Sequence, residues 1–282
     1  MKNIAIISNK SRDRSYAVTR EVYLRLSAMG FVCWLDGSAA ESILGDAGFD
    51  TLPDGTDLVI VVGGDGSMLD ASVQAIQRNI PMLGVNLGKV GYLSEVEPDN
   101  LEVLGRLSTG EYIIDQKMLL SVSKSSEGRV TTSTRLAVND VILSHDTFLG
   151  IADFTLENAN GEHVKYRADG MILSTPAGST AYSLSAGGPI VAHHIDSILA
   201  TPICPHSFFN RSIIFNPTER IKLINTSSSY LNLSVDGRAF ATLKSGEECV
   251  VSRSEKRMKM LTFNENNMFS TLFRKMRILE EI

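Results

Sequence analysis

The sequence predicts an α/β domain with a parallel sheet, followed by an all-β domain. Two observations lead to this prediction. In the first part of the chain, short apolar runs alternate with segments whose apolar residues recur at helical spacing. From about Thr109 onward, short runs rich in Val, Ile, Thr and Phe are separated by turn residues. The predicted domains are 1–108 (α/β), 109–264 (mostly β) and 265–282 (a helical tail).

The sequence of the first domain predicts strands that alternate with helices. The expected strands are 4–8, 31–35, 58–62 and 82–85, and the expected helices are 15–29 and 67–78. Gly30 is placed to stop the first helix, and Pro81 opens the last of these strands. Strands separated by helices form a parallel, Rossmann-like sheet, which binds ligands beyond the carboxyl ends of its strands. Two glycine-containing segments, 63–66 and 86–91, lie at such ends.

The sequence of the second domain predicts strands in a β-sandwich-like arrangement. The expected strands are 119–124, 132–144, 152–157, 171–174, 213–215, 221–224, 231–235, 249–252 and 258–263. Asn160-Gly161 and Asp236-Gly237 have the composition of hairpin turns. One helix is expected to interrupt the strands near Ser179. The segment 269–282 has apolar residues along one helical face, which predicts a final helix.

Composition narrows the possible functions. Of the 282 residues 43% are hydrophobic and 21% charged, as in soluble globular proteins, and no apolar run is long enough to span a membrane. The N-terminus lacks the features of a signal peptide, which predicts a cytoplasmic protein. A net charge of −5 argues against nucleic acid as the main partner but not against a nucleotide. Cys33, Cys204 and Cys249 are far apart, so we expect reduced, packed thiols.

The most informative segment reads Ile-Val-Val-Gly-Gly-Asp-Gly and ends at Gly66. Gly63, Gly64 and Gly66 allow the backbone to approach a ligand closely. Ser67 can cap the following helix, whose first N–H groups favour a phosphate. Beside bound phosphates, the carboxylate of Asp65 could take a proton from an attacking hydroxyl or hold a divalent metal. The alternative is a tight turn with a surface aspartate.

Two further segments carry polar residues in unusual positions. Val-Asn-Asp-Val places Asn139 and Asp140 inside an expected strand, where a polar pair can hold ribose hydroxyls. A hairpin turn or strand-end cap is the alternative for this pair. The segment from Asp169 to Pro189 combines glycines with hydroxyl side chains, which can approach a phosphate or a ribose.

These three segments resemble the NAD kinase family. The resemblance extends to Asn-Leu-Gly-Lys-Val-Gly-Tyr-Leu from Asn86, to Ile-Cys-Pro-His ending at His206 and to Val-Asp-Gly ending at Gly237, and it covers about 58–238. It implies transfer of the γ-phosphate of ATP to the 2′-hydroxyl of the adenosine ribose of NAD, giving NADP. It also implies a divalent cation, with Mg²⁺ favoured, held mainly by phosphates and waters rather than by a dedicated protein site.

The resemblance has consequences for partners and architecture as well. It implies small-molecule nucleotides as ligands. The net charge and the lack of a membrane-length apolar run predict neither nucleic acid nor membrane as a partner. It implies a homo-oligomer, a dimer or a tetramer, with the dinucleotide site near a subunit boundary. The helical tail 265–282 is expected to pack back on the α/β domain.

The resemblance also assigns site residues. Asp65 matches the catalytic base, flanked by Gly63, Gly64 and Gly66. The residues matching nucleotide contacts are Asn139, Asp140, Arg167, Asp169, Thr180, Ala181, Tyr182, Ser183, Leu184 and Ser185, with Asn86, His206 and Arg238 as further candidates. The family usually has Asn-Glu where this chain has Asn139-Asp140. A packed tyrosine and a surface arginine are the alternatives for Tyr182 and Arg167.

Two other functions share parts of this pattern. A lipid or sugar kinase could carry Gly-Gly-Asp-Gly, but it would leave the segment 169–189 unexplained. A non-catalytic NADP(H) sensor could keep the fold, but it would not need Asp65. ATP-dependent formation of NADP separates the three functions.

Overall fold

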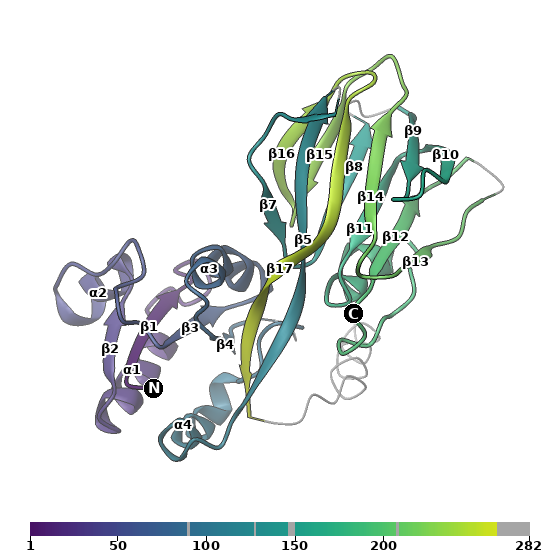
Figure 1. Cartoon of the computed structure of the whole chain (residues 1–282). Helices are drawn as coiled ribbons and strands as arrows, with labels where there is room; N and C mark the ends of the chain where they lie inside the picture. Colours follow the sequence, from purple (N-terminus) through teal and green to yellow (C-terminus); the bar gives the residue numbers. More distant parts are fainter. Residues whose placement is uncertain (89–90, 127, 146–149, 207–208, 264–282) are drawn as a thin grey trace. The chain divides into compact units, whose positions relative to one another are not determined.

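The structure is a computed structural model, and it describes residues 1–88, 91–126, 128–145, 150–206 and 209–263 (Figure 1). The chain divides into two compact units: unit 1 is Met1–Lys117 with Arg257–Ile282, and unit 2 is Met118–Lys256. The domain boundaries 1–108, 109–264 and 265–282 stay a prediction. The expected tail helix and its packing lie outside the described residues. None of the described helices is long and apolar enough to cross a bilayer.

Unit 1 contains a parallel sheet with helices, which confirms the predicted α/β class. Its elements are β1 (Asn3–Ser8), α1 (Ala17–Ala28), β2 (Val32–Leu35), α2 (Gly37–Leu44), β3 (Leu58–Gly63), α3 (Asp65–Gln77), β4 (Met82–Asn86), the 3-10 helix η1 (Pro98–Gly105) and α4 (Arg106–Thr109). The strands run in the order β4-β3-β1-β2. Every residue of β3 is buried, as expected for a parallel strand covered on both faces. The sequence analysis missed α2 and η1, which are 8 residues long each and too short for a clear helical period.

Unit 2 is a mostly β unit. Its elements are β5 (Ile113–Ser126), which begins in unit 1, β6 (Arg129–Val130), β7 (Arg135–Ala137), β8 (Asp140–His145), β9 (Ala152–Glu157), β10 (His163–Ala168), β11 (Gly170–Ser174), the 3-10 helix η2 (Gly178–Thr180), α5 (Tyr182–Ser185), β12 (Ile198–Ile203), β13 (Ile213–Phe215), β14 (Arg220–Asn225), β15 (Leu231–Val235), β16 (Arg238–Leu243) and β17 (Glu248–Thr262), which ends in unit 1.

Two groups of strands enclose the core of unit 2. One is the antiparallel sheet β13-β12-β11-β8-β15-β16, and the other is the run β10-β9-β14-β17 joined by β5. Alternate side chains from both groups form one buried cluster, in which Leu143 faces the core from the first group and Phe154 and Leu223 from the second. This arrangement confirms the predicted sandwich-like class.

Several expected boundaries in unit 2 are wrong for identifiable reasons. The strand expected over 132–144 is broken at a bend into β7 and β8. The sequence analysis missed β12, in which Pro202 weakens the strand pattern. The helix expected near Ser179 is two short helices, because Ala181 has φ −94° and ψ −129°. The expected packing of all three thiols is wrong for Cys204, which is exposed, whereas Cys249 is buried.

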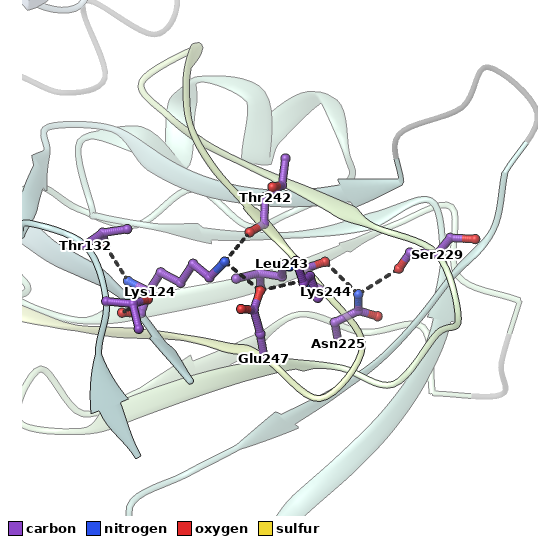
Figure 2. A network of polar contacts seen from close by, with 9 residues as sticks. Lys124, Thr132, Asn225, Ser229, Thr242, Leu243, Lys244 and Glu247 are labelled. Atoms are coloured by element: carbon purple, nitrogen blue, oxygen red, sulfur yellow. Dashed lines mark hydrogen bonds and ion pairs between the residues drawn. The ribbon is translucent and has the colours of Figure 1, made fainter. Parts of the chain in front are cut away.

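A polar network fixes the turn between β16 and β17 (Figure 2). The ammonium of Lys124 lies 2.6 Å from Oε2 of Glu247 and donates to the Thr242 carbonyl at 2.8 Å. Oε2 of Glu247 also accepts the backbone N–H of Lys244 at 2.7 Å. Burial acts to raise the pKa of Glu247, but these hydrogen bonds and the positive charge of Lys124 bring it below its ordinary value. The network therefore stabilises the turn that precedes β17.

Candidate active site

The carboxylate of Asp65 lies at the start of a helix. β3 ends at Gly63, and Gly64, with φ −120° and ψ −172°, turns the chain into α3 at Asp65. A Cβ on Gly63 would lie 2.6 Å from Oγ of Ser67, so a larger residue would displace the first helical turn. The expectation that Ser67 caps α3 is wrong. The helix has already begun at Asp65, and the Ser67 hydroxyl accepts a hydrogen bond from Nδ2 of Asn9 at 2.7 Å.

Backbone donors orient the Asp65 carboxylate. Oδ2 accepts the N–H of Tyr92 at 2.9 Å, and Oδ1 accepts the N–H of Leu93 at 3.0 Å. A Cβ on Gly91 would overlap Oδ1, so the loop closes over the carboxylate only because this residue is glycine. An ionised carboxylate only accepts hydrogen bonds, and each of its oxygens can accept more than one. The half-buried Asp65 is therefore held in a defined orientation by the loop that follows β4.

The side chain of Asn86 stabilises the loop that follows β4. Its side chain is buried, with 2% exposure, and Nδ2 donates to the Gly88 carbonyl at 3.1 Å and lies 3.3 Å from Oε2 of Glu97. Oδ1 accepts the N–H of Gly88 at 3.3 Å. The backbone N–H of Leu87 donates to the carbonyl of Gly63 at 2.8 Å, which ties this loop to the Gly-Gly-Asp-Gly turn. A nucleotide contact by Asn86 itself stays a prediction.

In unit 2, the pair Asn139-Asp140 lies at a bend. The expectation that it stands inside a strand is wrong, because β7 ends at Ala137 and β8 begins at Asp140. The carboxylate of Asp236 accepts the N–H groups of Val138, Asn139 and Asp140 at 2.8, 2.8 and 3.1 Å. The N–H of Asp236 donates to the carbonyl of Asp140 at 3.0 Å. A side chain from a distant turn therefore holds the whole bend.

The segment after β11 holds the other side of the same bend. Thr175 donates its N–H to the Asn139 carbonyl at 2.9 Å and its hydroxyl to the Val138 carbonyl at 2.6 Å. A Cβ on Gly178 would lie 2.5 Å from the carbonyl carbon of Asn139, so the two backbones can meet only at a glycine. The Asn139 side chain is half-buried and makes no hydrogen bond to a described residue. Its amide is therefore available to a ligand.

Asp140 combines burial with a neighbouring carboxylate. Burial, with a smaller contribution from the charge of Asp236, raises the pKa of Asp140 to about 7. Burial also raises the pKa of Asp236, although the three backbone N–H groups act in the opposite direction. Near neutral pH, Asp140 can therefore donate as well as accept a hydrogen bond, which suits a vicinal pair of ribose hydroxyls.

The raised pKa of Asp140 predicts a pH-dependent effect of Asp140→Asn on stability. The pKa is about 7 in the folded chain against 3.8 for a free side chain, so ionisation of Asp140 lowers folding stability as pH rises between these values. Asparagine removes this cost. In thermal unfolding, we compare the Tm of the variant with the Tm of the unsubstituted protein. We expect the Tm of the variant minus that of the unsubstituted protein to be larger at about pH 8 than at about pH 5. Glu255→Gln, on an exposed side chain of β17, is the control, and an equal Tm difference at both pH values would contradict the prediction.

Arg167 and His206 lie next to each other in unit 2. The His206 N–H donates to the Arg167 carbonyl at 2.7 Å. The guanidinium of Arg167 is exposed and lies 4.0 Å from the Asp153 carboxylate, a loose ion pair of little energetic value. Asp169 lies between β10 and β11, and its side chain makes no hydrogen bond to a described residue. The side chains of Arg167 and Asp169 can therefore turn to a ligand at small cost.

The predicted contacts over 180–185 divide into two groups. The Thr180 hydroxyl donates to the Ala177 carbonyl at 3.1 Å, and the Ser183 hydroxyl lies 3.0 Å from that of Thr201. These two side chains are buried and are already used inside unit 2. Tyr182 is 45% exposed, so the packed-tyrosine alternative does not hold for it. Ser185 and Leu184 are exposed, Ala181 is half-buried, and Arg238 is exposed at the start of β16.

Comparison with known proteins gives the family. Residues 4–112 match the ATP-NAD kinase N-terminal domain, and residues 138–263 match the ATP-NAD kinase C-terminal domain. The chain belongs to the NAD kinase family. It is 34% identical over 281 residues to an NAD kinase of Geobacter sulfurreducens, covering 98% of this chain and 99% of that protein. It is 32% identical over 281 residues to an NAD kinase of Natranaerobius thermophilus, covering 98% of each.

Solved structures of NAD(H) kinases have the same fold. The crystal structure of yeast NADH kinase complexed with NADH has a TM-score of 0.83 and 25% identity, covering 97% of this chain and 86% of that chain. An NAD kinase from Archaeoglobus fulgidus in complex with ATP has a TM-score of 0.73 and 23% identity, covering 98% of each chain, and shows the fold alone. Both support the α/β and β classes predicted from the sequence.

Two supporting residues, Asp236 and Thr175, were not predicted from the sequence. Asp236 was assigned to a hairpin turn, and positive φ values at Asp236 (48°) and Gly237 (74°) confirm that turn. Predicting the turn does not predict the hydrogen bonds that the Asp236 side chain accepts from three backbone N–H groups. Thr175 was one hydroxyl among many in the glycine-rich segment. The signal available in the sequence was a carboxylate and a hydroxyl, each directly after the last residue of a strand.

The described residues of this NAD kinase contain no group of three or more His, Cys, Asp or Glu side chains that could hold a metal ion. Mg²⁺ binds readily through substrate phosphates, waters and one or two carboxylates. The Gly-Gly-Asp-Gly turn fits that mode, since Asp65 supplies one carboxylate. The divalent cation stays a prediction.

Proposed function

We propose that this chain transfers the γ-phosphate of ATP to the 2′-hydroxyl of the adenosine ribose of NAD, giving ADP and NADP. Membership of the NAD kinase family over nearly the whole chain supports the reaction. The observation that carries the chemistry is the Asp65 carboxylate, held by two backbone N–H groups at the start of α3. A kinase needs such an oriented acceptor, whereas a non-catalytic dinucleotide sensor does not.

The proposed chemistry at Asp65 is general-base catalysis. A ribose hydroxyl is a weak nucleophile, and its oxygen becomes a better one as its proton moves to a carboxylate. The 2′-oxygen forms the new bond to the γ-phosphorus, the bond from that phosphorus to the bridging oxygen breaks, and ADP leaves with the electron pair. The N–H groups at the start of α3 favour the phosphate charge. A bound divalent cation, where present, would neutralise further phosphate charge.

The residues of unit 2 would position the acceptor. The free amide of Asn139 and the carboxyl of Asp140 can hold ribose hydroxyls, because the bend that carries them is fixed from both sides. Arg167, with its exposed guanidinium, can pair with a phosphate of the dinucleotide. The exposed ring of Tyr182 can stack on a base or on the nicotinamide.

A matrix of phosphate donors against acceptors tests the proposed reaction. Purified protein would be assayed with ATP, other nucleoside triphosphates or polyphosphate as donors. The acceptors would be NAD, NADH and diacylglycerol, each with and without Mg²⁺. We expect NADP from ATP and NAD, and loss of activity on chelation of the metal. Phosphorylation of the lipid alone would support a lipid kinase, and tight NADP(H) binding without turnover would support a sensor.

Asn139→Ala is expected to raise the KM for NAD much more than the KM for ATP. The variant loses a hydrogen bond to the acceptor ribose, and an unpaired partner costs about 1–3 kcal/mol, or roughly five- to 150-fold in affinity. Asn160→Ala, on an exposed turn residue of unit 2, is the matched control. If the ATP KM rises and the NAD KM does not, Asn139 belongs to the donor site instead.

Cytoplasmic location and a homo-oligomeric state, dimer or tetramer, belong to the same proposal. The family resemblance supports them. Analytical ultracentrifugation of the full chain, with and without NADP, measures the oligomeric state directly. A monomer at micromolar concentration in both conditions would contradict that part of the proposal.

A further inference from the structure

The guanidinium of Arg12 lies over two glycines of unit 1. Arg12 is in the loop between β1 and α1. A Cβ on Gly64, just before α3, would lie 3.8 Å from Cζ of Arg12, and a Cβ on Gly88 would overlap Nη1 and lie 3.3 Å from Cζ. The loop follows β1, Gly64 follows β3 and Gly88 follows β4, so the guanidinium lies at the carboxyl ends of three neighbouring parallel strands. Ligands of parallel α/β sheets bind at this edge.

The backbone that carries Arg12 is anchored before and after it. The N–H of Asn9 donates to the Val62 carbonyl at 2.9 Å, and its side chain donates to Ser67 in the first turn of α3 at 2.7 Å. The N–H of Arg12 donates in turn to the Asn9 carbonyl at 3.0 Å. These bonds hold Arg12 against the Gly-Gly-Asp-Gly turn.

Asp13 fixes the other side of the loop. Its side chain is 5% exposed, and Oδ2 accepts the N–H and the hydroxyl of Thr19 at 2.9 and 2.7 Å. This places a capping carboxylate on the first turn of α1. The main chain of Arg12 is therefore part of a rigid frame, although its side chain is exposed.

The Arg12 guanidinium has no hydrogen bond or ion pair with a described residue. A guanidinium presents five N–H donors in a planar fork that matches two phosphate oxygens. The two carboxylate oxygens of Asp65, the acidic residue of the adjoining turn, already accept backbone N–H groups. Arg12 therefore places a cation with no partner among the described residues beside the turn that should receive the phosphates.

We infer that Arg12 binds the terminal phosphates of the phosphoryl donor. This inference rests on the proposed kinase function, and Arg12 lies outside the segments that resemble the NAD kinase family. It gives Gly88 a role as well, because any side chain there would displace the guanidinium. Arg12 would act on donor affinity, and the acceptor residues of unit 2 would be unaffected.

The test compares Arg12→Ala and Arg12→Lys with Arg14→Ala, which removes an exposed arginine from the same loop. We expect Arg12→Ala to raise the KM for ATP about ten- to a hundredfold, the range of a charge-assisted hydrogen bond, and to change the KM for NAD less than about twofold. Arg12→Lys should recover part of the ATP affinity, because an ammonium keeps the charge but not the fork. Equal ATP KM values for Arg12→Ala and Arg14→Ala, in folded proteins of equal Tm, would overturn the inference.

Direct binding separates this inference from the proposed function. Inorganic tripolyphosphate would be titrated into the full chain by calorimetry, with no acceptor present. Weaker binding to Arg12→Ala than to Arg14→Ala supports the phosphate contact even if no NADP is formed, and equal binding refutes it even if NADP is formed. Gly88→Ala is a second variant: we expect it to weaken tripolyphosphate binding in the unsubstituted protein but not in the Arg12→Ala protein. Equal weakening in both would also count against the inference.

Discussion

Replacement of Asp65 by asparagine is expected to lower kcat by about 10²- to 10⁴-fold, the usual cost of removing a general base. An amide cannot take the proton of the 2′-hydroxyl. The side chain is nearly isosteric, so NAD affinity and the fold should change far less than turnover. The measurement is steady-state kinetics with NAD and ATP, together with the dissociation constant for NADP and the Tm.

The hydrogen bonds of Asp65 predict a second effect of the same substitution, on stability. Both oxygens accept backbone N–H groups, from Tyr92 and Leu93, so the NH₂ of an asparagine must face one of these donors. A modest fall in Tm is therefore expected beside the large fall in kcat. Asp99→Asn, on an exposed residue of η1, controls for loss of a charge in unit 1. An Asp65→Asn protein with more than half of the original kcat would contradict the assignment of Asp65 as the general base.

Asp236→Asn is expected to destabilise unit 2 and weaken NAD binding together. Oδ1 of Asp236 accepts from Asn139 and Asp140, and Oδ2 accepts from Val138. Asparagine has one acceptor oxygen, so at least one buried N–H loses its partner, at about 1–3 kcal/mol of unfolding free energy. Because the bend carries Asn139, the KM for NAD should rise while the KM for ATP stays close to its original value. Urea unfolding and two-substrate kinetics measure both effects.

A pH profile separates a positioning role of Asp236 from general destabilisation. Burial is the main cause of the raised pKa of Asp140, and the charge of Asp236 adds to it. Removing that charge should move the pH dependence of the NAD KM toward lower pH, which loss of stability alone would not do. Glu255→Gln provides the control for unit 2. An unshifted profile with an unchanged NAD KM would contradict the assigned role.

The sequence predicted those parts of the fold that depend on local pattern. Short apolar runs predicted β1, β3 and β4, helical spacing predicted α3, and the Asp-Gly turn was located from two adjacent residues. Asp65 could be singled out because its glycine neighbours adjoin it in the chain. These features share one property, that the residues which define them are close in sequence.

The parts that could not be predicted depend on contacts between distant segments. Asp236 reaches backbone groups 96 to 98 positions earlier, and no local pattern encodes that distance. Arg12 lies against Gly88 only because β1, β3 and β4 are neighbours in the sheet. Ser67 looked like a helix cap because the residue type suits one, but the glycines before it allow α3 to begin earlier.

The pairing of β17 with β4 has a consequence for biosynthesis. Met260 lies opposite Met82 in the parallel sheet of unit 1, yet all of unit 2 is translated between them. Unit 2 is one continuous stretch and can fold as it leaves the ribosome, whereas the nascent unit 1 must wait for its last described strand. During that interval the start of β4, at Met82, lacks its partner strand, whereas the end of β4 already bonds to Glu95 and Val96. An unpaired strand edge of this kind can recruit strands from other chains. A message truncated before the codon for Arg257 would make that exposure permanent.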